Sequence, residues 1–204
     1  MSSLNLAGVF TDALHEHIHT IRQLESQQDA FERAAILITD SLLRGNKVLW
    51  CGNGGSAADS QHLAAELVGR FQHPRAALAS IALTTNTSVL TAIANDFSYE
   101  EVFERQVEAL CQPGDVVVGI STSGNSRNVC AALSKAKERQ AATVVMTGAN
   151  GTRLSSLADV SIHVPSADPA RVQEAHILFG HMLCQWVELA SCINHAVTNG
   201  GDEP

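Results

Sequence analysis

The chain has 204 residues, of which 45% are hydrophobic and 17% charged, values ordinary for a globular protein that buries much of its surface. Its net charge of −8 argues against a general nucleic-acid binder, so an anionic ligand must be held locally by backbone N–H groups and a few cations. No apolar run approaches the roughly 18 residues of a membrane span. Five cysteines without C-x-x-C spacing and a first segment unlike a signal peptide predict a cytoplasmic protein with reduced thiols.

Two helices are predicted at the start of the chain. Apolar side chains at helical spacing indicate one amphipathic helix over about 4–26. Asp29 and Glu32 then have the spacing of a capping box. The apolar periodicity that follows them predicts a second helix to about Arg44, where a Gly-Asn pair ends it.

From there, short β-rich runs alternate with helical segments. The runs are nearly continuous in apolar residues, as strands covered on both faces are. The alternation predicts right-handed βαβ units, and therefore an α/β fold: a three-layer αβα sandwich around a five-stranded parallel sheet, with an N-terminal helical extension. The expected strands are 47–51, 79–83, 115–120, 142–147 and 159–164. The expected helices between them are 56–70, 87–94, 99–111, 126–139 and 152–157.

A long helix is predicted over 169–196, with Asp168 as its cap and Pro169 in its first turn. Apolar residues occupy most of its circumference, which in a chain of this size suggests packing against other subunits. No repeat or linker divides the sequence. We therefore interpret residues 1–204 as a single domain in which the helices of 1–44 and 169–196 contribute to oligomer contacts.

Two Gly/Ser-rich turns, each between a predicted strand and a predicted helix, are candidate phosphate sites. Glycines allow close backbone approach, hydroxyls add donors, and a helix N-terminus offers unpaired N–H groups. Each turn alone could be a simple connection, but both lie at carboxyl ends of parallel strands, where ligands bind. Neither has a P-loop or dinucleotide motif, so the pair predicts a small phosphorylated ligand rather than ATP or NAD. The turns are Cys51-Gly52-Asn53-Gly54-Gly55-Ser56 and Ser121-Thr122-Ser123-Gly124-Asn125-Ser126.

A polar stripe runs along the predicted helix that follows the first turn. His62, Glu66 and Arg70 recur every four residues beside the apolar face. The first two could ligate one metal ion, or place a base beside a proton donor. The simpler interpretation is a solvated stripe with an ordinary ion pair between Glu66 and Arg70.

Polar residues also interrupt the apolar C-terminal helix, namely Gln173, His176 and His181. Buried polar groups need partners, so either histidine alone could be a satisfied core residue. Gln173 and His181 are eight residues apart, roughly 12 Å along a helix axis. To act at one point they need a bent helix or contributions from different subunits. Asn95 and Asp96 are expected in a polar loop, where Asp96 could bond sugar hydroxyls or simply form a turn.

Taken together, these motifs resemble the bacterial phosphoheptose isomerases of the sugar-isomerase (SIS) fold. The likeness extends from Phe31 to Trp186 and is strongest in segments 51–71, 93–103, 114–129 and 170–181. It implies interconversion of sedoheptulose 7-phosphate and D-glycero-D-manno-heptose 7-phosphate, an early step toward the heptose of lipopolysaccharide core. It also implies a cytoplasmic homotetramer with active sites between subunits and one zinc ion per subunit.

The resemblance also assigns site residues. It implies an acid/base pair of Glu66 and His181, and metal ligands at His62, Glu66, Gln173 and His181. A carboxylate bound to zinc is a weaker base, so Glu66 is expected to ligate zinc in one state and act as base in another. The implied substrate contacts are Asn53, Gly54, Gly55, Ser56, Glu66, Asn95, Asp96, Ser121, Thr122, Ser123, Ser126 and Gln173. Arg70 matches a position near the site.

Aldose–ketose isomerisation needs a base, an acid and stabilisation of the enediolate between them. We assign Glu66 as the base and His181 as the acid, with zinc to polarise the carbonyl or to fix the site. The main alternative is a non-catalytic SIS protein that binds the replication initiator; such relatives keep the phosphate turns but tend to lose the acidic residue and the last histidine. Both are present here, which favours the enzyme. A sugar-sensing regulator would need a DNA-binding segment, which the sequence lacks.

Overall fold

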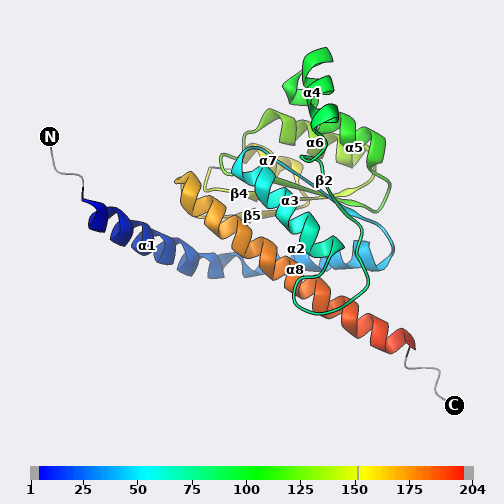
Figure 1. Ribbon diagram of the computed structural model, residues 1–204, viewed down its shortest axis with the longest axis horizontal. Helices are drawn as coiled ribbons and strands as arrows, with labels where there is room; N and C mark the ends of the chain where they lie inside the picture. The colour runs from blue at the N-terminus through cyan, green and yellow to red at the C-terminus, as the bar shows by residue number, and fades with distance from the viewer. Residues whose placement is uncertain (1–4, 151, 200–204) are drawn as a thin grey trace.

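Five parallel strands in the order β2-β1-β3-β4-β5 form the centre of the computed structural model, which describes residues 5–150 and 152–199 (Figure 1). Helices cover both faces of this sheet, which confirms the predicted three-layer α/β fold. The strands are β1 (Val48–Gly52), β2 (Ser80–Ala82), β3 (Val116–Ser121), β4 (Ala142–Thr147) and β5 (Val160–His163).

The helices follow the predicted order, and most begin or end within two residues of the predicted bounds. They are α1 (Leu6–Gln23), α2 (Gln28–Leu43), α3 (Gly55–Val68), α4 (Thr87–Asp96), α5 (Glu104–Leu110), α6 (Arg127–Glu138), α7 (Thr152–Leu157) and α8 (Pro169–Asn199). Two short 3₁₀ helices, η1 (Leu24–Gln27) and η2 (Tyr99–Glu101), complete the set. The first predicted helix began at residue 4, which lies outside the described residues.

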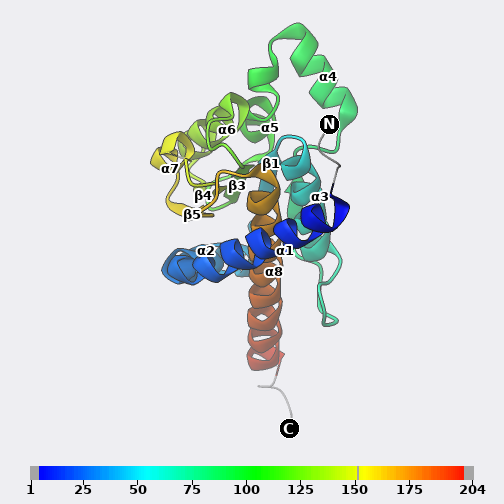
Figure 2. The same ribbon diagram turned by 90° about the vertical axis from the view of Figure 1, so that its left-hand side faces the viewer.

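Alternate residues of each strand belong to two separate hydrophobic cores, one on each face of the sheet. In β1, Val48 and Trp50 pack with α2, α3 and α8, whereas Leu49 and Cys51 pack with α5, α6 and α7. Figure 2 shows these helices on opposite sides of the strands. Trp50 is buried with its indole N–H satisfied, since Nε1 donates to Ser80 Oγ at 2.9 Å. Because both faces are covered, the strands read as continuous apolar runs.

Two local predictions were wrong. The capping box does not form: the chain passes directly from η1 into α2, so Asp29 lies inside the first helical turn. Gln27 occupies the cap position, but its side chain makes no capping hydrogen bond and accepts the N–H of His163 instead. Glu32 instead accepts from Gln28 Nε2 at 2.8 Å. The predicted Asn95-Asp96 loop is the last turn of α4, because the N–H of the next residue still bonds back to a helical carbonyl.

Helices α3 and α8 lie side by side and run in the same direction. A methyl group built on Gly180 of α8 would lie 2.5 Å from Leu63 of α3, so the glycine is what permits this close approach. Asp168 caps α8 as predicted, accepting from the N–H of Ala170 at 2.8 Å. The helix is continuous over its 31 residues (Figure 1), which removes the bent-helix alternative. None of the helices in the described residues is long and apolar enough to span a bilayer.

We expect the unfolding free energy to fall in acid because of His176 in α8. Its side chain is fully buried, neither ring nitrogen makes a well-aligned hydrogen bond within the described residues, and burial lowers its pKa to about 4 despite the nearby Thr147 backbone. The unfolded chain binds this proton near pH 6.5, so the unfolded state is the more protonated one between pH 6.5 and 4. We expect up to about 3 kcal/mol of unfolding free energy to be lost as pH falls through this window.

Urea unfolding between pH 4 and 7.5, with chelator present and at fixed protein concentration, measures this effect. His176→Gln should flatten the curve over that window. Asp59 acts in the opposite direction, because burial raises its pKa to about 6 although His62 lowers it, so its contribution is lost as pH rises from about 4 to 6. Asp59→Asn should therefore steepen the curve, and an unchanged curve in both variants would contradict the assignment.

Candidate active site

Both Gly/Ser-rich turns lie at one edge of the sheet. Strands β1 and β3 are neighbours, with Gly52 paired to Ile120, and the strand order reverses between them. Such a reversal point, beyond the carboxyl ends of the strands, is where open α/β sheets bind ligands. The fold therefore brings the two predicted phosphate turns together.

A hydrogen-bond network fixes the first turn. The amides of Asn53 and Asn128 bond each other at 2.9 Å, and the Tyr99 hydroxyl donates to Asn53 Oδ1 at 3.0 Å. Asn128 is buried in the first turn of α6, the helix that follows the second turn. Asn53 thus links the two turns, and its side chain is held by partners that lie far away in sequence.

The glycines of the first turn have separate uses. Gly54 has φ +57°, a conformation that residues with a side chain rarely adopt. At Gly55, the first residue of α3, an added methyl group would lie 2.5 Å from the Gln173 amide. Gln173 therefore covers the N-terminus of α3, while Ser56 is buried in its first turn.

Hydroxyl groups converge on one another in the second turn. Ser121 Oγ lies 2.9 Å from Ser126 Oγ and 3.4 Å from Ser123 Oγ, and it accepts the N–H of Gly124 at 3.2 Å. Thr122 is half-buried and its carbonyl accepts the N–H of a glycine after β4. Ser126 occupies the cap position of α6 without making a side-chain cap bond, which leaves donors near this helix start for an anion.

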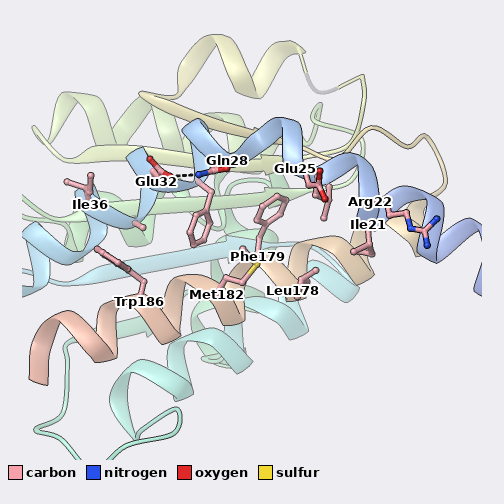
Figure 3. Close-up of a pocket in the computed structure, with 13 residues that line it drawn as sticks. Ile21, Arg22, Glu25, Gln28, Glu32, Ile36, Leu178, Phe179, Met182 and Trp186 are labelled. Carbon is pink, nitrogen blue, oxygen red and sulfur yellow. Dashed lines mark hydrogen bonds between the residues drawn. The ribbon is translucent and has the colours of Figure 1, made fainter.

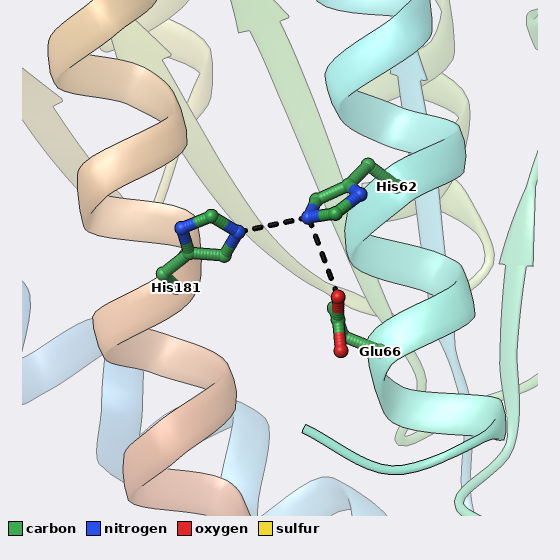
Figure 4. Close-up of side chains that lie close together, drawn as sticks. All are labelled: His62, Glu66 and His181. Atoms are coloured by element: carbon green, nitrogen blue, oxygen red, sulfur yellow. Dashed lines mark hydrogen bonds and ion pairs between the residues drawn. The ribbon is translucent and has the colours of Figure 1, made fainter. Parts of the chain in front are cut away.

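Three of the predicted polar residues meet between α3 and α8 (Figure 4). His62 Nε2 lies 2.8 Å from His181 Nε2 and 3.3 Å from Glu66 Oε1. The three ligand atoms all lie within 4.8 Å of one another. Glu66 pairs with His62 rather than with Arg70, so the interpretation of this stripe as an ordinary Glu66–Arg70 ion pair is wrong.

Two imidazoles and one carboxylate are a donor set that suits zinc, and three protein ligands with an open position are typical of catalytic zinc sites. His62 is exposed, and Glu66 and His181 are half-buried, so a ligand can reach this group from solvent. The same three side chains can also move protons, because imidazole and carboxylate are the usual acid/base groups. The geometry is compatible with either role.

Other predicted residues lie apart from this group. Gln173 lies at Gly55, two turns of α8 before His181. Asn95 and Asp96 are exposed at the end of α4, with Asn95 Nδ2 donating to Asp96 Oδ1 at 2.8 Å. Helix α4 has no buried residue and projects from the body of the chain (Figure 2).

Sequence reasoning missed three residues that contact the predicted site. Tyr99 and Asn128 hold Asn53, and the Phe71 ring packs on the His181 imidazole with centroids 5.5 Å apart. Phe71 follows directly on the stripe of His62, Glu66 and Arg70 in sequence, which was the one available signal. Tyr99 and Asn128 gave none, because their contacts depend on tertiary structure.

The comparisons with known proteins agree with this geometry. A family model described as SIS domain matches residues 10–148. The phosphoheptose isomerase from Aquifex aeolicus is 56% identical to the chain, and the match covers 76% of this chain and 82% of that protein. The phosphoheptose isomerase from Aliarcobacter butzleri is 51% identical, over 84% of this chain and 92% of that protein. The solved phosphoheptose isomerase from Neisseria gonorrhoeae superimposes with a TM-score of 0.86 at 42% identity, over 91% of this chain and 100% of that one. The chain belongs to the phosphoheptose isomerase family of SIS-domain proteins.

Proposed function

We propose that this chain interconverts sedoheptulose 7-phosphate and D-glycero-D-manno-heptose 7-phosphate, in the cytoplasm, to supply heptose for lipopolysaccharide core. The observation that carries the proposal is the His62–Glu66–His181 group, in which His62 and Glu66 lie on α3, the helix that begins at one phosphate turn, and His181 lies on the neighbouring α8. Membership in a family of phosphoheptose isomerases supports it.

Each part of the site has one task in this reaction. The two turns bind the phosphate through backbone N–H groups and the hydroxyls of Ser121, Thr122, Ser123 and Ser126. Gly54 and Gly55 let the sugar phosphate approach the backbone, with Asn53, Ser56 and Gln173 around it. Asn95 and Asp96, on the projecting α4, are assigned to the sugar hydroxyls. The phosphate thereby orients the reacting carbons toward Glu66 and His181.

Glu66 and His181 carry the proton transfers. Going from ketose to aldose, Glu66 takes a proton from C1 and the electron pair moves to form the enediolate. His181 donates a proton to C2, and the proton of the C1 hydroxyl is transferred to the C2 oxygen, which leaves the aldehyde at C1 and a hydroxyl at C2. The same two groups serve the reverse direction with their roles exchanged.

We assign one zinc ion per subunit to His62, Glu66 and His181, with Gln173 as a fourth ligand. When bound, zinc would polarise the substrate carbonyl or fix the orientation of these side chains. Because α8 is continuous and Gln173 lies at Gly55, a fourth ligand from Gln173 would come from a different subunit. Zinc content per chain, measured after dialysis against a weak chelator, tests the assignment.

Self-association is part of the proposal, with the helices of 1–44 and 169–196 as contact elements of a single-domain homotetramer. Helix α1 extends away from the sheet (Figure 1) and leaves Phe10 67% exposed. An apolar hollow of about 730 Å³ opens between α2 and α8. Phe179, Met182 and Trp186 are among the residues that line it, and Trp186 is 48% exposed (Figure 3). Exposed apolar surface of this kind supports the assignment of these helices to subunit contacts. Sedimentation analysis measures the subunit number.

Conversion of sedoheptulose 7-phosphate by the pure protein tests the proposed reaction. We expect the anomeric proton signals of the aldose to appear in the NMR spectrum. No conversion, with or without added zinc, would overturn the isomerase. A pull-down against the replication initiator tests the alternative binding function, against which the presence and proximity of Glu66 and His181 argue.

A further inference from the structure

A single buried carboxylate anchors the loop that follows α3. Glu188 of α8 is 1% exposed. Its Oε1 accepts the backbone N–H groups of Gln72 and His73, each at 2.7 Å, and its Oε2 accepts that of Phe71 at 2.8 Å. Three consecutive amides of this loop are therefore fixed to one side chain two turns beyond His181.

Arg75 extends this anchor to the end of α3. Its Nε lies 3.4 Å from Glu188 Oε2, and its Nη2 donates to the carbonyl of Glu66 at 2.7 Å. Burial raises the pKa of Glu188, but the three amide N–H groups and Arg75 together lower it by more. The net pKa is therefore below its usual value, and the carboxyl group is ionised at neutral pH. The pair thus holds the helical turn that carries Glu66.

The anchored loop also contacts the second catalytic residue. Phe71 packs on the His181 imidazole with an angle of 31° between the rings, while the ring of His62 meets His181 edge-on at 5.0 Å between centroids. With two rings against it, the half-buried imidazole has few orientations available. Phe71 thus packs against this imidazole, and its backbone N–H is bonded to Glu188.

We propose that Glu188 is a positioning residue for the isomerisation: through Phe71 it sets the orientation of the His181 imidazole, and through Arg75 it holds the turn of Glu66. This rests on the proposed function of His181 as the acid. The phosphate turns lie at the opposite end of α3, so substrate binding should not depend on Glu188. The effect should therefore fall on kcat and not on KM.

Substitutions of Phe71 test the contact with His181. Phe71→Leu should lower kcat about tenfold or more and change KM by less than about twofold, because a displaced catalytic group costs rate rather than binding. Phe71→Tyr, which keeps the ring, should restore most of kcat. In spectra of imidazole-labelled protein, the His181 signals, identified by their loss in His181→Ala, should shift in Phe71→Leu. Wild-type kcat or an unmoved His181 signal in Phe71→Leu would overturn the proposal.

Glu188→Gln tests the anchor, with Asp115→Asn as its matched control. Asp115 is also 1% exposed and accepts the N–H of Gln112 at 2.7 Å, the N–H of Lys47 at 2.9 Å and Lys47 Nζ at 2.6 Å, but it lies at the other end of β3. Both variants should lower stability, and only Glu188→Gln should lower kcat. An equal fall of kcat in Asp115→Asn would reduce Glu188 to a structural role.

The double variant separates the routes of action. If Glu188 acts through Phe71, adding Phe71→Leu to Glu188→Gln should change kcat by less than about twofold, because coupled residues are not additive. Fully additive losses would overturn that route. If Glu188→Gln does not fold, the kcat values and NMR spectra of Phe71→Leu and Phe71→Tyr test the proposal instead. The NMR shift needs no substrate, so an inactive wild-type protein would overturn the proposed function while leaving the Phe71–His181 contact measurable.

Discussion

Glu66→Gln and His181→Ala should each lower kcat for sedoheptulose 7-phosphate by about 10²–10⁴-fold, the range that general acid–base groups contribute. Glu66→Gln removes the base while keeping nearly the same shape, so exchange of the substrate C1 proton with solvent should stop together with isomerisation. His181→Ala removes the acid, and with it a ring that contacts both His62 and Phe71. Because the two residues act as a unit, the double variant should be little worse than either single one.

His15→Ala is the matched control, since this histidine is exposed on α1 and away from the site. It should keep wild-type kcat. Subunit number and unfolding midpoint should be similar in all these variants, because Glu66 and His181 are only half-buried. Full activity in either Glu66→Gln or His181→Ala would remove that residue from the mechanism. Zinc content measured on the same samples shows whether a lost ligand accompanies the lost activity.

Periodicity made the fold predictable because buried parallel strands and amphipathic helices leave strong patterns in sequence. The errors lie at element ends, where backbone hydrogen bonds decide the outcome. The predicted capping box of Asp29 and Glu32 does not form because the residues before α2 already form the 3₁₀ helix η1. Asn95 and Asp96 have turn-forming side chains, yet the apolar residues before them extend α4 through both.

The candidate site residues could be named from the sequence, but their arrangement in space could not. His62 and His181 are 119 positions apart, and their contact depends on Gly180, whose missing side chain lets α8 approach Leu63. Glu188 was overlooked because it lies beside apolar neighbours in a helix already assigned to subunit contacts. One signal was available: a carboxylate in a largely buried helix needs a partner.

Gly52→Ala should damage the phosphate site, because the added methyl group would press against the backbone of two neighbouring elements. Gly52 ends β1, and a methyl group on it would lie 2.8 Å from both the carbonyl oxygen and Cβ of Ser56 and 2.9 Å from the carbonyl oxygen of Ile120. Two of these atoms are backbone, in the first turn of α3 and in β3, so no side chain can rotate away. The N-terminus of α3 must move relative to β3, and the two phosphate turns with it.

We expect Gly52→Ala to lower the unfolding free energy by about 1–3 kcal/mol, as overpacking of a well-packed core does. Displacement of the turn should lower kcat/KM by up to about 100-fold, mainly through KM, since the phosphate contacts are the ones that shift. Gly8→Ala is the matched control: its added methyl group meets the end of the flexible Asn5 side chain, and activity should not change. Glu66 and His181 lie about three turns along α3 and α8. A Gly52→Ala variant with unchanged KM but reduced kcat would therefore mean that the first turn positions the catalytic pair rather than the phosphate.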